Sequence, residues 1–236
     1  MSKSVLIIGG STGIGAALAA HYKAEGTTVS VISRRNASSD TLGYFWFQDQ
    51  LQSDPHSSEC VGRALEQKPD TIFICNGVLY DDAAMPEKAI RQLDFAILQQ
   101  RLQSNLLVPA RYLQLLFNYL CKTDDVKVLV LSAKVGSISD NALGGWYSYR
   151  ISKAALNMLI KNISIELGRI NKSAVVLSVH PGTTDTVLSE PFQRNLAPGQ
   201  LQSAAITAQR LAALARIVQP EQTGALCHWD GSILPF

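Results

Sequence analysis

Short apolar runs alternate with segments of helical periodicity along the chain. Runs of strand length lie at 5–8, 28–32, 71–75, 126–131, 174–179 and 224–229, and a further short strand is expected at 42–47. Helical patterns cover 13–25, 55–66, 86–121, 147–169 and 203–218. Continuous Val, Ile and Leu runs suit parallel strands that are buried on both faces. The alternation predicts an α/β fold, a doubly wound parallel sheet of about seven strands with helices on both faces.

Composition predicts one domain over residues 1–236. The chain is 47% hydrophobic and 17% charged, which is enough apolar material for one core of this size. Pro181, Pro191 and Pro198 interrupt any period in the segment 181–202. Because this segment follows a late strand, on the edge where α/β sheets bind ligands, we interpret it as a loop that covers the substrate.

Charge and motif spacing narrow the classes of partner. A net charge of +2 without blocks of like charge argues against a nucleic-acid partner. The first apolar run ends at Gly9, which is too short for a membrane span or a signal segment, so we expect a cytoplasmic protein that does not contact membranes. Isolated histidines and the widely spaced cysteines predict free thiols and no metal site; the cysteines are Cys60, Cys75, Cys121 and Cys227.

A glycine-rich turn follows the first predicted strand and precedes a helix. Glycines let the backbone approach a pyrophosphate closely, and the amides at the start of the next helix face its negative charge. The order of strand, turn and helix therefore predicts a Rossmann-like dinucleotide site. Its candidate residues are Gly9, Ser11, Thr12, Gly13, Ile14 and Gly15.

Two arginines follow the second predicted strand. An NAD-specific fold offers a carboxylate there to the ribose 2′-hydroxyl, whereas Arg34 and Arg35 would pair with a 2′-phosphate. The sequence therefore predicts NADP(H) as the cofactor.

Tyr149 and Lys153 lie one helical turn apart on one face of a predicted helix. A phenol is a poor acid or base at neutral pH, and a nearby ammonium group lowers its pKa toward the working range. Tyr149 could then exchange a proton with a carbonyl or alcohol oxygen.

Together these motifs resemble the short-chain dehydrogenase/reductase family over nearly the whole chain. Gly9, Gly13 and Gly15 match its T-G-x-x-x-G-x-G turn, with Ile8 in place of the Thr. The resemblance implies that Lys153 lowers the pKa of Tyr149 and binds the nicotinamide ribose.

Further positions match motifs of the same family. The resemblance implies that Asp49 contacts adenine, that Asn76 and Gly77 belong to the N-N-A-G segment, and that Asn105 helps to hold a water for proton relay. It also implies contacts with the nicotinamide end of the cofactor from Pro181, Gly182, Thr183 and Thr186.

Within the family, the chain is most similar to C-factor-like and sniffer-like carbonyl reductases. One position departs from the family pattern, because Ala133 stands where the substrate-orienting Ser is usual. Ser132 and Ser137 are the two candidates to replace it. Strand alternation favours Ser137, unless the strand ends before this point.

The resemblance implies an NADPH-dependent oxidoreductase that acts on a small carbonyl or alcohol. An NADP(H)-binding regulatory or signalling protein with weak turnover is the alternative, because Ala133 removes the usual hydroxyl. Family members commonly pair two helices across a two-fold axis, and these correspond here to the helix predicted over 147–169 and the long helix that ends near Cys121. A homodimer or homotetramer is therefore also implied.

Overall fold

Eight strands form one sheet in the computed structural model, which describes residues 3–81, 84–194 and 196–236. Their order across the sheet is β10-β9-β6-β5-β4-β1-β2-β3. The strands are β1 (Ser4–Ile8), β2 (Thr28–Ser33), β3 (Phe45–Gln48), β4 (Thr71–Ile74), β5 (Lys127–Leu131), β6 (Val175–His180), β9 (Leu226–His228) and β10 (Ile233–Leu234).

The predicted doubly wound sheet is confirmed, with one more strand than expected. The seven strands predicted from apolar runs are all present and pair in parallel. The eighth strand, β10, pairs antiparallel with β9 through Ile233 and Leu234. Two residues are too few to give a period-2 pattern, which is why the sequence did not reveal this strand.

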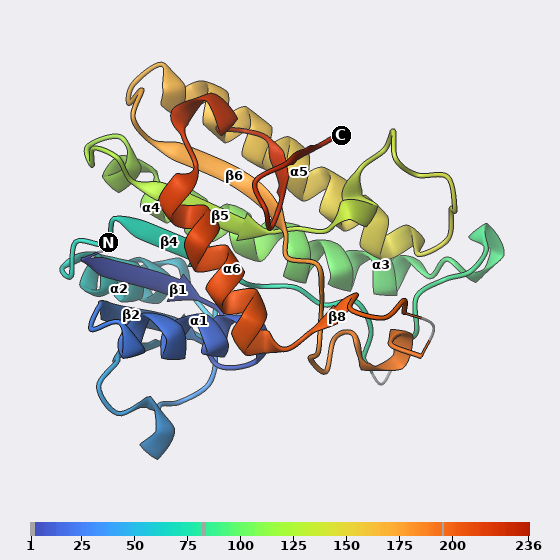
Figure 1. Cartoon of the computed structure of the whole chain (residues 1–236), viewed down its shortest axis with the longest axis horizontal. Helices are drawn as coiled ribbons and strands as arrows, with labels where there is room; N and C mark the ends of the chain where they lie inside the picture. Colours follow the sequence, from blue (N-terminus) through green and yellow to red (C-terminus); the bar gives the residue numbers. More distant parts are fainter. Residues whose placement is uncertain (1–2, 82–83, 195) are drawn as a thin grey trace.

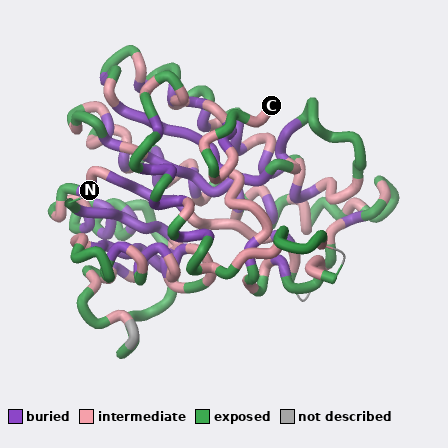
Figure 2. Tube along the Cα trace, viewed as in Figure 1, coloured by how far each residue is buried: buried purple, intermediate pink, exposed green. Residues whose placement is uncertain are grey.

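Helices cover both faces of the sheet (Figure 1). Helices α1 (Gly13–Ala24) and α6 (Ala204–Ile217) pack side by side on one face. The other face is covered by α2 (Asp54–Leu65), α4 (Val108–Leu120) and α5 (Tyr147–Gly168). The strands between these layers form the buried centre of the molecule (Figure 2).

The long helix predicted over 86–121 is wrong in its first nine residues. Helix α3 (Phe95–Leu102) starts only after Asp94, whose carboxylate accepts the backbone N–H groups of Ala96 and Ile97 and so caps the helix. A π-helical segment, Gln103–Leu107, then joins α3 to α4. A π-helical turn contains one more residue than an α-helical turn, and such turns are frequent at functional sites.

The carboxyl ends of the parallel strands meet at one edge of the sheet. The irregular segment 181–202 begins there, after β6, and its two short strands, β7 (Thr183–Thr184) and β8 (Leu201–Gln202), pair with each other in parallel. Within the residues that the structure describes, no helix is long and apolar enough to cross a membrane. The cytoplasmic location remains a prediction.

At the amino ends of the parallel strands, which form the opposite edge of the sheet, a buried Asn171 holds the end of α4. Its amide nitrogen donates to the carbonyl oxygens of Leu120 and Thr123, each at 2.8 Å, and its amide oxygen accepts from Ser173. We expect Asn171→Ala to lower the free energy of unfolding by about 1–3 kcal/mol, because it removes the donor of a buried carbonyl group at Leu120 and of a partly buried one at Thr123. Urea unfolding of the two proteins measures this change, and a difference below ~0.5 kcal/mol would contradict it.

Candidate active site

The glycine-rich turn connects β1 to α1 in a conformation that requires glycine. Gly9 and Gly13 have φ angles of +83° and +53°, a region that other residues rarely adopt. A Cβ atom on Gly15 would collide with the carbonyl oxygen of Gly9. Thr12 precedes α1 without a side-chain hydrogen bond to the helix, so side chains leave the first amides of α1 accessible.

A cavity of about 1530 Å³ runs from this turn across the carboxyl edge of the sheet to the segment 181–202. Most residues singled out from the sequence line it. They are Gly9, Thr12, Gly13, Ile14, Gly15, Arg35, Asn76, Gly77, Ser132, Tyr149, Lys153, Pro181, Gly182, Thr183 and Thr186. Five others, Ser11, Arg34, Asp49, Asn105 and Ser137, are outside this lining.

Arg34 and Arg35 are both exposed directly after β2. Their backbone is fixed, because the carbonyl oxygens accept hydrogen bonds from Gln48 and Trp46 and the Arg35 N–H group donates to Ser33. No ion pair among the described residues engages either guanidinium group. Arg35 therefore lies in the cavity lining, and Arg34 is its exposed neighbour outside that lining.

Asp49 is fully buried and its carboxylate is already bonded within the protein. It accepts hydrogen bonds from Tyr112, Ser57 and the backbone N–H group of Leu51, at 2.8–3.1 Å. The structure thus ties β3 to α2 and α4 through Asp49 and does not bring its carboxylate to the cavity.

Tyr149 and Lys153 lie in the first two turns of α5 and are both buried. The Lys153 Nζ atom donates to the carbonyl oxygen of Leu131 at 2.9 Å and lies 5.9 Å from the centre of the Tyr149 ring. Burial lowers the pKa of Lys153 to about 8. Burial also raises the pKa of Tyr149, so the lowering expected from Lys153 is outweighed here by loss of water around the phenol.

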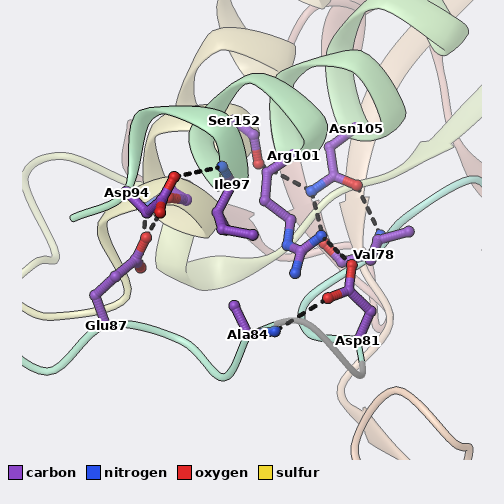
Figure 3. A network of polar contacts seen from close by, with 10 residues as sticks. Val78, Asp81, Ala84, Glu87, Asp94, Ile97, Arg101, Asn105 and Ser152 are labelled. Atoms are coloured by element: carbon purple, nitrogen blue, oxygen red, sulfur yellow. Dashed lines mark hydrogen bonds and ion pairs between the residues drawn. The ribbon is translucent and has the colours of Figure 1, made fainter. Parts of the chain in front are cut away.

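Asn105 lies in the π-helical segment and ties three elements together (Figure 3). Its side chain accepts from the N–H group of Val78 at 2.7 Å, and donates to the Val78 carbonyl oxygen and the Ser152 hydroxyl at 2.9 Å each. Ser152 precedes Lys153 on α5. Asn105 therefore holds the loop after β4 against the helix that carries Tyr149 and Lys153.

Neither candidate serine presents a free hydroxyl to the cavity. Strand β5 ends at Leu131, so the alternation that favoured Ser137 does not extend to it. The Ser137 hydroxyl accepts from the Asp140 N–H group, whereas Ser132 lines the cavity but donates to Asn157 at 2.7 Å. Ala133 also lines the cavity and packs with Tyr149.

No motif of the sequence indicated the apolar cluster that surrounds Tyr149. Trp146 and Phe192 pack with ring centres 4.9 Å apart and ring planes tilted by 56°. Tyr80 contacts Phe192 edge-on, and Trp146 contacts Tyr149 edge-on. These rings come from three separate loops and α5, so no local pattern joins them.

Three polar side-chain atoms of residues that line the cavity are buried without a partner among the described residues. They are Oδ1 of Asn76, beside the glycine-rich turn, Nδ1 of His180, at the end of β6, and Nε of Arg150, in the first turn of α5. Burial lowers the pKa of His180 to about 4, so its ring is neutral at neutral pH. No three His, Cys, Asp or Glu side chains in the described ranges are grouped in a way that could hold a metal ion.

Comparison with known proteins agrees with this architecture. Residues 3–197 match the family model described as short chain dehydrogenase. A 1-hydroxy-2-glutathionyl-2-methyl-3-butene dehydrogenase of Rhodococcus is 33% identical over 172 residues, which cover 72% of this chain and 69% of that protein.

Solved structures share the fold over the full chain. The carbonyl reductase Sniffer of D. melanogaster superposes with a TM-score of 0.84 at 20% identity and covers 100% of both chains. An NADPH-bound carbonyl reductase from chicken fatty liver gives a TM-score of 0.79 at 18% identity and covers 99% of both. The family model, the Rhodococcus relative and the shared fold together show that the chain belongs to the short-chain dehydrogenase family of oxidoreductases.

Proposed function

We propose that this protein is an NADP(H)-dependent oxidoreductase that transfers a hydride between nicotinamide and a small carbonyl or alcohol. The observation that carries the proposal is the position of Tyr149 and Lys153 in the same cavity as the glycine-rich turn. One end of that cavity suits a dinucleotide phosphate and the other suits an apolar substrate. Proton-transfer groups lie between these ends.

The residues of the turn fit an NADP(H) cofactor. The glycine-rich turn would let the backbone approach the pyrophosphate closely, and the first amides of α1 would donate to it. Arg34 and Arg35 would pair with the 2′-phosphate, and the orphaned Asn76 Oδ1 would accept a donor of the cofactor. NADPH is bound in the chicken carbonyl reductase and NADP in a related Burkholderia multivorans structure.

The bound nicotinamide would supply or accept the hydride. Lys153 would donate to the nicotinamide ribose, and the segment with Pro181, Gly182, Thr183 and Thr186 would hold the nicotinamide ring at the carboxyl end of β6. A Cβ on Gly13 would contact Thr186 at 3.3 Å, so this segment already lies against the glycine-rich turn. We expect the adenine end to contact the backbone near Asp49 rather than its bonded carboxylate.

Proton transfer would fall to Tyr149. In reduction, its hydroxyl donates a proton to the oxygen that gains charge as the carbonyl is reduced; in oxidation, the phenolate takes the proton of the alcohol. The Lys153 ammonium stabilises that phenolate. Asn105 would support the relay by holding α5 and the loop after β4 in place.

The apolar cluster favours a substrate with a bulky apolar group beside its carbonyl. Trp146 and Phe192 present ring surface next to Tyr149, and Ala133 adds a methyl group rather than a hydroxyl.

A regulatory or signalling protein with weak turnover is the second candidate. One observation favours it: Ala133 faces the cavity and both neighbouring serine hydroxyls are bonded elsewhere. The C-signal protein of Myxococcus xanthus is 27% identical over 151 residues, which cover 63% of this chain and 84% of that protein.

Assembly into a homodimer or homotetramer belongs to the same proposal. A groove of about 730 Å³ lies between α4 and α5, with Phe117, Leu159 and Ile163 in its lining. Leu107, in the π-helical segment before α4, and Met158, on α5, add exposed apolar surface. A second copy of the chain would cover this surface.

Cofactor preference tests the role of the two arginines. We expect the double substitution Arg34→Ser and Arg35→Ser to weaken NADPH binding by about tenfold or more and to spare NADH, because each charge-assisted phosphate contact is worth ~1.5–3 kcal/mol. Titration of both cofactors measures this, with Arg169→Ser at the far end of α5 as a matched control. Equal affinity of the unchanged protein for NADPH and NADH would refute the assignment.

Removal of one hydroxyl tests the acid/base role. Tyr149→Phe should reduce turnover of NADPH with a carbonyl panel by about 10²-fold or more and leave NADPH binding intact, since only the ionisable group is lost. Tyr147→Phe, two residues earlier on α5, is the matched control. If Tyr149→Phe turns over as fast as the control, the mechanism is wrong.

Restoring the usual serine tests how the substrate oxygen is held. We expect Ala133→Ser to raise turnover several-fold, because it places a hydroxyl at the cavity surface next to Tyr149. Ser132→Ala should impair turnover more than Ser137→Ala, since only Ser132 lines the cavity. The opposite order would assign the substrate contact to Ser137. No gain from Ala133→Ser, with no loss from either alanine variant, would favour the regulatory protein.

A further inference from the structure

Helix α5 starts without a cap of its own. Its N-cap residue, Trp146, has φ 52° and ψ 42°, and its side chain makes no hydrogen bond to the helix. An uncapped helix leaves its first N–H groups unsatisfied, and the first turn then frays. Tyr149 lies in that first turn, so its position depends on how the turn is held.

Glu87 supplies the missing cap from a distant loop. This glutamate precedes Ser148 by 61 residues and is only 6% exposed. One carboxylate oxygen accepts from the Ser148 N–H group at 3.2 Å, and the other accepts from the Ser148 hydroxyl. The Glu87 carbonyl oxygen also accepts from the Trp146 N–H group at 2.5 Å.

The chain before α5 is shaped to reach this residue. Gly144 and Gly145 have φ angles of +65° and +67°, which together with Trp146 make three consecutive left-handed residues. A Cβ on Gly145 would lie 3.3 Å from the carbonyl oxygen of Glu87, so a larger residue would push the two segments apart. The close approach therefore requires glycine at this point.

The arrangement differs from the ordinary cap on α3. There, Asp94 lies immediately before its own helix and accepts two N–H groups of the first turn. Glu87 instead lies on a separate loop, and its side chain points from that loop toward the helices (Figure 3). A carboxylate at a helix start interacts favourably with the helix dipole, so it stabilises α5 by charge as well as by hydrogen bonds.

The loop that carries Glu87 also contributes to both ends of the cavity. Asn76 and Gly77, at its start, line the cavity beside Lys153, and Tyr80 packs on Phe192 in the segment 181–202. Its far end is bonded to the first turn of α5. One connection between β4 and α3 thus contacts the groups proposed for cofactor binding, substrate binding and proton transfer.

We propose that Glu87 is a positioning residue for Tyr149, acting through the first turn of α5. The inference rests on the proposed function, since it gives Tyr149 a reaction to perform. A misplacement of about 1 Å at a reacting group can cost around 10²-fold in rate. Glu87 touches neither Tyr149 nor Lys153 through any hydrogen bond of the described residues, so its effect passes through Ser148 and the helix backbone.

The test compares Glu87→Ala with Asn171→Ala in the full-length protein. Asn171 is buried to a similar extent and also holds a helix end, but at the opposite edge of the sheet. We expect Glu87→Ala to lower kcat for NADPH oxidation with 9,10-phenanthrenequinone or 4-nitrobenzaldehyde by about tenfold or more, with the Kd for NADPH changed less than about twofold. Asn171→Ala should lower thermal stability but keep kcat within about twofold of the unchanged protein.

Milder variants keep the test informative if Glu87→Ala does not fold. Glu87→Gln retains an oxygen for the Ser148 N–H group and should lose less turnover, and Ser148→Ala removes only the hydroxyl bond. In the double variant Glu87→Gln with Ser148→Ala, the losses should not add, because both changes break the same contact. Additive losses would mean that Glu87 acts by another route.

A readout that needs no activity separates this proposal from the proposed function. Hydrogen exchange of the amides of Tyr147, Ser148 and Tyr149 should be faster in Glu87→Ala than in Asn171→Ala. Unchanged exchange, or a kcat equal to that of Asn171→Ala, overturns the positioning role. If the Tyr149→Phe variant turns over as fast as the unchanged protein, the proposed function is overturned instead, whatever Glu87 does to the helix.

Discussion

The contact between Gly136 and α5 sets the position of the whole candidate site. A Cβ on Gly136 would lie 2.9 Å from the carbonyl carbon and the Cβ of Lys153 and 3.0 Å from the Asn157 amide nitrogen. Only glycine allows the loop after β5 to come this close to the helix. Two hydrogen bonds follow from that approach, from Lys153 to the Leu131 carbonyl oxygen and from Ser132 to Asn157. The proton-transfer groups are thereby fixed against the carboxyl ends of the central strands.

The burial of Lys153 is unfavourable in free energy, because its ammonium group loses water, and an apolar residue with only a structural role would not have this penalty. An ammonium group that loses water becomes easier to deprotonate, which is why burial lowers its pKa to about 8. The phenol of Tyr149 changes in the opposite direction for the same reason, because burial disfavours its charged form. Groups whose pKa values are shifted by burial inside a cleft are typical of functional sites. Here the shifts accompany a geometry that keeps both groups in one cavity.

Ser132, Ala133 and Ser137 show how tertiary contacts decide the use of similar side chains. The three residues are close in sequence, yet only Ser132 and Ala133 line the cavity, and the Ser137 hydroxyl caps a turn through Asp140. Asp49 is a parallel case, because its carboxylate bonds to Tyr112 and Ser57 rather than facing the cavity. In each case the hydrogen-bond partner lies on a segment that the local sequence does not identify.

The sequence by itself determined the doubly wound sheet, the glycine-rich turn, and the pairing of Tyr149 with Lys153. These features depend on local periodicity and spacing, which are written in consecutive residues. Only the tertiary structure decided the apolar cluster around Tyr149 and the cap that Glu87 gives to α5. Those features depend on contacts between residues far apart in the chain, and chain folding brings such residues together without leaving a periodic pattern at either one.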